Sequence, residues 1–281
     1  MRYQRLFVLF ALLSTGARAQ WLHYPTPGIP RTRDGKPNLS APSPRASNGK
    51  PDLSGLWQVE PTPFDEMTRL FGEGLDALSV PGDDLRTFSK YTISILADFK
   101  PEEAPIRPEA AQIVQHRMET DGIENPTAQC LLGGIPFGGL LPFPNKFIQT
   151  PGVIVILQEA DGALRQIFTD GRKHTADPQP SWMGYSVGKW EGDSLVVDTV
   201  GFNDKGWLDG LGHPRSEALR VQERYRRRDF GHMDVQVTID DPKMYTRPFS
   251  IKYTLDLVPD SEIAEYVCAE NEKDRAHIGK Q

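Results

Sequence analysis

The sequence predicts a mainly β protein: an antiparallel up-and-down β-barrel of about eight to nine strands, preceded by a Pro-rich strap and a few short helices. Segments after Cys130 are rich in β-branched and aromatic residues, turn residues separate them, and apolar side chains alternate with polar ones along them. Closing such a meander removes exposed strand edges, and roughly eight strands enclose side chains or one small ligand. A β-sandwich would produce the same pattern and stays open as the alternative.

Composition indicates a folded protein without the charge of a nucleic-acid binder. The 281 residues include 32 Lys and Arg against 38 Asp and Glu, a net charge of −6. This acidic balance disfavours nucleic acid as a partner, because phosphate binding needs a basic surplus. Hydrophobic residues at 38% and charged residues at 25% are typical of a globular chain rather than a disordered one.

The first nineteen residues have the pattern of a secretory signal peptide. Arg2 and Arg5 precede an apolar run at 6–13, and a small-x-small triplet ends at Ala19. A run of that length is too short to cross the roughly 30 Å hydrocarbon core of a membrane. We therefore expect cleavage after Ala19 and a periplasmic or secreted protein with no stable membrane anchor. Loss of three arginines would leave 29 basic and 38 acidic side chains, a net charge of −9.

Export changes the interpretation of Cys130 and Cys268, which are the two cysteines of the chain. An oxidising compartment favours a disulfide between them, and two buried free thiols are the alternative. The bond would join the chain entering the first barrel strand to the last strand.

Residues 20–63 form a Pro-rich region with an internal repeat. The phrase at 30–40 returns at 44–54 with a period of fourteen residues, each copy carrying a Gly-Lys-Pro turn. Two copies cannot build a solenoid, so we expect a strap lying on the main domain, with a disordered linker as the alternative. The expected strap anchors are Leu39, Leu53, Leu56 and Trp57.

Between the strap and the barrel, residues 64–129 are predicted to be irregular and partly helical. The clearest helix is at 108–120, where Pro108 suits a first turn. The barrel is expected at 130–270 and a C-terminal tail at 271–281. The helix's expected apolar face consists of Ala111, Ile113, Val114 and Met118. The candidate barrel strands are 146–149, 153–159, 164–170, 182–190, 194–200, 218–227, 233–239, 249–257 and 263–268.

Several motifs resemble those of a widespread, uncharacterised family of exported proteins of environmental bacteria. They lie at 166–172, 180–193 and 201–204, with further matches at 212–217, 223–225, 238–242 and 265–268. The resemblance implies a lipocalin-like β-barrel and no particular mechanism. Gly188-Lys189-Trp190 also resembles the Gly-x-Trp element of lipocalins, although here it lies in the middle of the meander.

Two carboxylates lie on strand faces that are otherwise apolar. Glu223 alternates with Val221 and Tyr225, and Glu265 lies in a similar setting. If Glu223 faces the interior, desolvation should raise its pKa into the range useful for general acid or base catalysis. The alternative is an internal ion pair with an Arg from a neighbouring strand.

A loop before the strand at 218–227 carries a second candidate group. His213 could transfer protons there with Glu217 orienting it, and the alternative is a solvated loop histidine. Ser216 completes the side-chain types of a nucleophilic triad, but no nucleophile-elbow pattern surrounds it. His174 lacks metal-ligand spacing to other histidines, and no metal or cofactor is predicted.

The favoured function is binding of a small, partly apolar or aromatic molecule in the barrel lumen. An acid/base enzyme, a lyase, isomerase or hydrolase acting on such a molecule or on a glycoside, is the alternative, and a structural or partner-binding role is the third. The candidate catalytic residues are Glu223, His213, Asp170 and Tyr245. The candidate ligand-binding residues are Trp182, Tyr185, Tyr225, Tyr253, Glu217 and Glu265.

Overall fold

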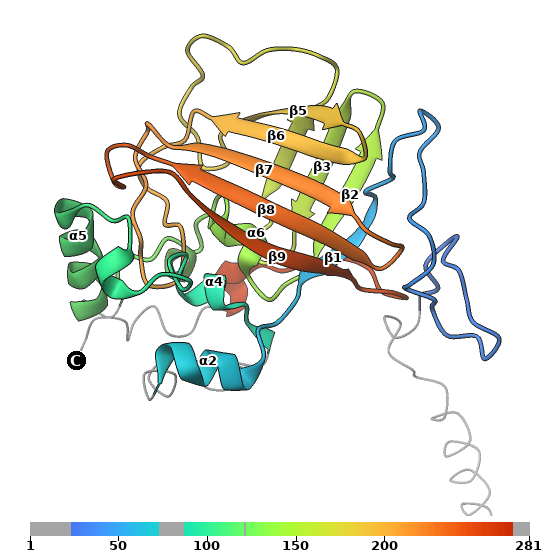
Figure 1. Cartoon of the computed structure of the whole chain (residues 1–281), viewed down its shortest axis with the longest axis horizontal. Coiled ribbons are helices and arrows are strands. Elements are labelled where there is room, and N and C mark those ends of the chain that lie inside the picture. Colours follow the sequence, from blue (N-terminus) through green and yellow to red (C-terminus); the bar gives the residue numbers. More distant parts are fainter. Residues whose placement is uncertain (1–23, 73–86, 121, 272–281) are drawn as a thin grey trace, which may run out of the picture.

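Nine strands that follow one another in sequence order close into a barrel (Figure 1). The computed structural model describes residues 24–72, 87–120 and 122–271. A mainly β barrel is confirmed, and the sandwich alternative is wrong because a single sheet returns to its first strand. The predicted signal peptide lies outside the described residues.

The strands alternate buried and exposed side chains, as a sheet with one face toward a core requires. Their bounds are β1 (Gly55–Val59), β2 (Asn145–Thr150), β3 (Val153–Gln158), β4 (Leu164–Phe168), β5 (Tyr185–Glu191), β6 (Ser194–Val200), β7 (Arg220–Arg227), β8 (His232–Asp240) and β9 (Phe249–Leu257). The longest strands, β7 to β9, show the predicted alternation, with apolar side chains buried at every second position over most of their length.

One neighbouring pair departs from the expected up-and-down pattern, because β4 and β5 run parallel. The connection at 169–184 returns the chain to the end where β4 began, so β5 points the same way. The two strands pair only at Ile167 with Ser186 and at Phe168 with Val187, whereas β3 and β4 share five pairs. The barrel wall is therefore weakly joined at this place.

The first and last strands also differ from the prediction. Residues 55–59, expected to end the strap, form β1 and pair with both β2 and β9. The expected strand at 263–268 is wrong, because residues 261–267 have no regular structure. β8 and β1 already pair with both edges of β9 at its C-terminal end, from which the chain continues toward 263–268.

The described helices are short, and none of them is part of the barrel wall. Their bounds are α2 (Phe64–Phe71), α4 (Lys90–Ile93), α5 (Pro108–Glu119), α6 (Phe137–Leu140) and α7 (Cys268–Asn271), with 3-10 turns η2 (Pro101–Glu103) and η3 (Thr127–Gln129). In Figure 1 α2 and α5 lie at the lower left, whereas the strap lies at the right. Within the described residues, no helix has the length and apolar character needed to cross a membrane.

Helix α5 confirms the predicted position but not the predicted apolar face. Ala111 and Met118 are exposed, and the buried residue of this helix is Ala110. Polar contacts attach the C-terminal part of the helix instead: Arg117 stacks on Trp207 at 4.7 Å and donates to the Gly212 carbonyl. Sequence periodicity cannot reveal such a contact, since the stem of a long cationic side chain also covers apolar surface.

The two repeat copies in the strap fold alike. The Thr32 amide donates to the Lys36 carbonyl, and the Ala46 amide donates to the Lys50 carbonyl, both at 2.9 Å. In each copy the chain then returns antiparallel, as bridges between 31 and 37 and between 45 and 51 show. The same local sequence therefore produces the same turn twice.

The first arginine of each copy connects its turn to the barrel. Arg31 pairs with Asp260 at 2.6 Å, and Arg45 forms a two-pronged contact with Asp193 at 2.8 and 3.0 Å. Both pairs are partly exposed, so each contributes at most about 1 kcal/mol. They fix the position of the strap more than they stabilise it.

Arg227 makes the stronger connection between strap and barrel. It is buried at the end of β7, and its N–H groups donate to the carbonyls of Asp52, Ser54 and Phe230. The guanidinium lies between the rings of Trp57 and Phe230, at 4.8 and 4.9 Å. Burial lowers the pKa of Arg227 to about 10, which leaves it charged at neutral pH.

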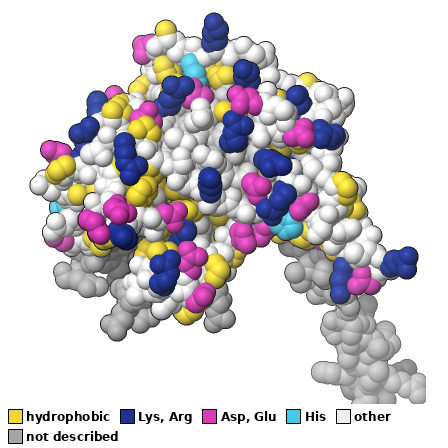
Figure 2. Space-filling model, in the orientation of Figure 1, with side chains coloured by type: hydrophobic (Ala, Val, Ile, Leu, Met, Phe, Trp, Pro, Cys, Tyr) yellow, Lys and Arg dark blue, Asp and Glu magenta, His cyan; other side chains and the backbone are white. Residues whose placement is uncertain are grey.

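Basic and acidic side chains are interspersed on the face that Figure 2 shows. Ion pairs on the outer sheet surface include Arg224 with Glu191 and Arg228 with Asp234, both at 2.7 Å. Opposite charges thus offset each other locally along β7.

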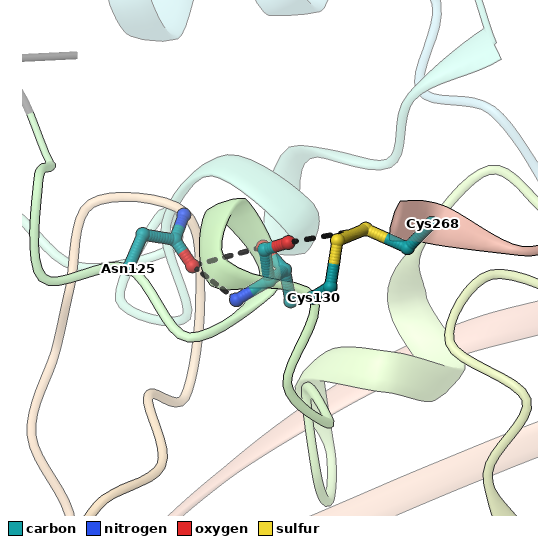
Figure 3. Close-up of a disulfide and its surroundings, with 4 residues drawn as sticks. Asn125, Cys130 and Cys268 are labelled. Carbon is teal, nitrogen blue, oxygen red and sulfur yellow. Dashed lines mark hydrogen bonds between the residues drawn. A yellow bond between two sulfur atoms is a disulfide. The ribbon is translucent and has the colours of Figure 1, made fainter. Parts of the chain in front are cut away.

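The expected disulfide between Cys130 and Cys268 is present, with an S–S distance of 2.06 Å (Figure 3). It joins the residue after η3 to the first residue of α7, so Cys268 does not lie in a last barrel strand as expected. Asn125 shapes the turn before Cys130 by accepting hydrogen bonds from the amide and hydroxyl of Thr127 at 3.0 and 2.9 Å. A disulfide is consistent with an exported protein.

We expect a Cys130→Ser/Cys268→Ser double variant to lose about 4–5 kcal/mol of unfolding free energy. The bond spans 138 residues of sequence, and long loops gain the most from a cross-link in the unfolded state. Urea denaturation of wild type and variant under oxidising conditions measures the loss. Reduced wild type is the matched control and should unfold at the variant's midpoint. An unchanged midpoint in the variant would contradict the assignment of a stabilising bond.

Candidate functional site

A buried ion pair crosses the barrel lumen. Glu223 on β7 faces Arg165 on β4, which lies three strands away around the wall. The contact has two prongs: Nη1 lies 3.0 Å from Oε1, and Nη2 contacts Oε2. Both side chains are at least 95% buried. The structure therefore contains the ion-pair alternative for Glu223, although the partner is not from a neighbouring strand.

Polar neighbours saturate the guanidinium of Arg165. Its Nε donates to Ser186 at 3.2 Å, and Nη2 donates to Thr199 at 3.0 Å. Ser186 and Thr199 bond to each other at 2.9 Å. Burial alone disfavours the charged guanidinium, but the negative charge of Glu223 outweighs this effect and raises the pKa of Arg165. Both partners of the ion pair are thus kept in place by a complete network.

Two tyrosines complete the polar side of the lumen. Tyr225 donates its hydroxyl to Glu223 at 2.6 Å, so the predicted tyrosine and carboxylate do meet. Burial, and next the negative charge of Glu223, raise the pKa values of Tyr225 and Tyr253 far above the usual range. Both phenols therefore stay protonated at neutral pH and act only as hydrogen-bonding groups.

The lumen itself is almost filled. The cavity beside Glu223 and Tyr253 has a volume of about 30 Å³. That is room for about two water molecules. Residues 135–139, at the start of α6, cover it, and the amide oxygen of Gln158 is buried there without a hydrogen-bond partner among the described residues. Little of the lumen, where the ligand was predicted to bind, is open space.

A larger space lies in the wall, where β4 and β5 separate. This cleft has a volume of about 410 Å³ and reaches the buried side chains of Arg165 and Ser186. Its remaining lining consists of Leu132, Leu164, Gln166, Phe168, Ser181, Trp182, Met183, Gly184 and Tyr185. Two of the four predicted aromatic ligand contacts, Trp182 and Tyr185, belong to it, whereas Tyr225 and Tyr253 line the lumen cavity.

Aromatic side chains form one end of this cleft. The rings of Phe168 and Tyr185 are 5.4 Å apart, and the Arg172 guanidinium lies 3.8 Å from the centre of the Phe168 ring. Arg172 is itself paired with Asp170 at 2.6 Å. Asp170, predicted to be catalytic, is thus an exposed partner of Arg172 and is not part of the luminal network.

His213 also has a different partner from the one expected. Its Nδ1 lies 2.5 Å from Asp209, which is fully buried, whereas Glu217 is exposed. Asp209 further accepts the amide of Ile95 at 2.6 Å. The expected orientation of His213 by Glu217 is therefore wrong, and the histidine is part of the packing between the 201–219 loop and the chain near α4.

The remaining predicted groups are dispersed. Ser216 donates its hydroxyl to Asp241 at 2.7 Å, so it does not form a triad with His213. Tyr245 is buried and donates to the Pro214 carbonyl at 3.0 Å. Glu265 is exposed in the irregular segment after β9, because the strand expected there does not form. These residues do not share one site with Glu223.

His174 belongs to an ion-pair cluster on the outer wall. Its Nε2 lies 2.9 Å from Asp198, which also pairs with Arg220 at 2.6 Å. Burial opposes ionisation of Asp198, but the hydrogen bond from Arg220 lowers its pKa overall. In the part of the chain that the structure describes, no three His, Cys, Asp or Glu residues form a group able to hold a metal ion.

Sequence reasoning missed two residues that determine these sites. Arg165 alternates with Ala163 and Ile167, so its inward direction was readable from the pattern. Asp209 has no such signal, since it lies in a long loop whose fold determines its contacts.

The protein matches no family model, no curated protein and no solved structure. Its resemblance to exported bacterial proteins stays a prediction.

We expect Glu223→Gln to lower the unfolding free energy by about 3–5 kcal/mol. The substitution leaves Arg165 buried without a counter-charge, which costs more than a lost surface contact. Urea denaturation monitored by tryptophan fluorescence measures the change. Glu217→Gln is the matched control, because Glu217 is exposed, and it should change stability by less than about 0.5 kcal/mol.

An Arg165→Met/Glu223→Leu double variant should regain most of that loss, because two apolar groups of similar size need no counter-charge. If Glu223→Gln were as stable as wild type, the ion pair would not be the stabilising contact that its burial indicates.

Proposed function

We propose that the protein is a periplasmic or secreted β-barrel that binds a small, partly apolar or aromatic molecule. The proposed site is the cleft between β4 and β5, and the lumen behind it supplies a rigid polar floor. The observation that carries this proposal is the cleft itself: about 410 Å³ of space with aromatic walls, within the usual size of ligand pockets.

A second hollow, of about 510 Å³, lies beside the disulfide and is less suited to a specific ligand. Its lining includes the exposed side chains of Leu131, Phe143 and Tyr266. Its carboxylate, Asp161, already accepts the amides of Gly133 and Ala163 at 2.8 and 3.0 Å. Few polar groups are left there to orient a ligand.

Binding is favoured over acid/base catalysis by the state of Glu223. A general base needs a lone pair directed at the substrate proton. Both carboxylate oxygens of Glu223 are instead occupied by Arg165, and one also accepts the Tyr225 hydroxyl. Glu223 is therefore assigned to the structure of the cleft floor.

Binding of the neutral dye N-phenyl-1-naphthylamine tests the proposed site. We expect Trp182→Ala to weaken dye binding at least about tenfold, because it removes the large aromatic wall of the cleft. Trp190→Ala is the matched control, since Trp190 lies further along β5 and does not line the cleft. Thermal denaturation of both variants confirms that they are folded.

Equal dye affinity of wild type and Trp182→Ala would contradict the site. Absence of dye binding, together with absence of any small molecule retained by the purified protein in native mass spectrometry, would contradict the function.

Export is tested separately by the mature N-terminus. We expect N-terminal sequencing of protein from the periplasm or medium to begin at Gln20, because the small-x-small triplet ends at Ala19. An intact Met1 in the cytoplasmic fraction would contradict it.

A further inference from the structure

We infer that the ligand of the β4–β5 cleft is a neutral, hydroxylated ring, that is, the face of a sugar. This inference rests on the proposed binding function and adds the chemical class of the ligand. It follows from the charges, the uncommitted hydrogen-bonding groups and the aromatic surfaces that the cleft presents.

The cleft offers no free charge to an ionic ligand. Arg165 is the charged residue of its lining, and all of its guanidinium nitrogens already donate to Glu223, Ser186, Thr199 or Tyr225. A ligand carboxylate would have to displace Glu223 and leave it buried without a partner, at high energetic cost.

Further charged groups lie next to the cleft without lining it. At its aromatic end, Arg172 and Asp170 offset each other. Arg215 donates to the Trp182 carbonyl at 3.1 Å, and its Nη1 is buried without a hydrogen-bond partner among the described residues, but Arg215 is not part of the cleft lining. Neither an anion nor a cation therefore finds an unpaired counter-charge on the cleft surface.

Three polar side chains of the cleft remain uncommitted. Gln166, which is exposed, Ser181 and Trp182 belong to its lining. Within the described residues, the Gln166 amide, the Ser181 hydroxyl and the Trp182 indole N–H have no hydrogen-bond partner in the protein. Together these three side chains offer both hydrogen-bond donors and hydrogen-bond acceptors to a ligand. A purely hydrocarbon ligand would cover these groups and leave them unsatisfied, which costs free energy for each.

The aromatic rings supply the complementary surface. Phe168, Trp182 and Tyr185 line the same cleft as the free polar groups. A pyranose ring has an apolar C–H face that packs on such rings, while its hydroxyls project from the ring edge. A neutral sugar ring thus meets both kinds of surface at once, whereas an ion or a plain aromatic hydrocarbon meets only one.

A panel of probes that share one aromatic ring tests the ligand class. It consists of the phenyl β-glycosides of glucose, galactose, mannose, xylose and N-acetylglucosamine, together with benzoate, benzylamine and N-phenyl-1-naphthylamine. Each is titrated into the full mature protein by isothermal calorimetry. We expect at least one glycoside to bind at least tenfold more tightly than benzoate and benzylamine.

Variants locate the binding of the best glycoside. Gln166→Leu should weaken glycoside binding about tenfold and dye binding less, because the glycoside loses a hydrogen-bonding partner. Gln222→Leu, at an exposed position on β7, is the matched control and should change neither affinity. Trp182→Ala should weaken both ligands.

The outcomes separate this inference from the proposed function. If the dye binds at Trp182 but no glycoside exceeds benzoate and benzylamine, the sugar class is wrong and the binding function stands. If Gln166→Leu leaves glycoside affinity unchanged, the assigned hydrogen bonds are wrong and so is the inference. If neither dye nor any glycoside binds, the proposed function fails as well.

Discussion

Arg165 and Glu223 carry opposite charges into an interior that excludes water, and this places a strict condition on the barrel. Each charge is tolerated only while the other stays within hydrogen-bonding distance. Ser186, Thr199 and Tyr225 occupy the remaining hydrogen-bonding positions of this pair, so its network is complete without a guest. The lumen is consequently packed with side chains, and the larger cleft lies in the barrel wall, between β4 and β5.

The position of this cleft depends on the direction of one strand. β5 runs parallel to β4, because the connection at 169–184 crosses back before β5 begins. Parallel neighbours need such a crossover, while the antiparallel pairs around them use tight turns. The crossover also brings Trp182 and Ser181 beside the start of β4, where they line the cleft. One topological exception therefore creates the space and supplies its aromatic wall.

Much of this fold could be predicted from local pattern, and the parts that could not depend on distant partners. The strand at Phe249–Leu257 was predicted to the residue, because its alternation is long and turn residues bound it. The segment at 263–268 alternates as well, but the C-terminal end of β9 is already paired on both edges, with β1 and with β8. The pattern of apolar residues at 55–59 was too short to predict a strand. A strand forms there because these residues pair with both β2 and β9.

The residues of the candidate site show the same difference: local pattern predicted the direction of some, and distant contacts determine the partners of others. The inward direction of Glu223 and Tyr225 followed from period-two alternation, and the structure places both in the lumen. Their partner on β4 could not be named, since which inward residues meet across a barrel depends on strand number and stagger. His213 is the opposite case: its loop position suggested Glu217 as a partner, while the folded loop brings it to the buried Asp209.

The cleft stays open because the backbone beside it is committed elsewhere. The Ser181 amide donates to the Gly201 carbonyl, and the Ser181 carbonyl accepts the Asn203 amide, so this segment extends the pairing of β6. Gly184 permits the turn into β5: its φ is +63°, and a Cβ there would lie 2.8 Å from the Thr199 side chain. Backbone groups that are already paired gain nothing by moving across to β4. The gap in the wall is thus part of the stable hydrogen-bonding pattern, and a ligand entering it need not break any strand pairing.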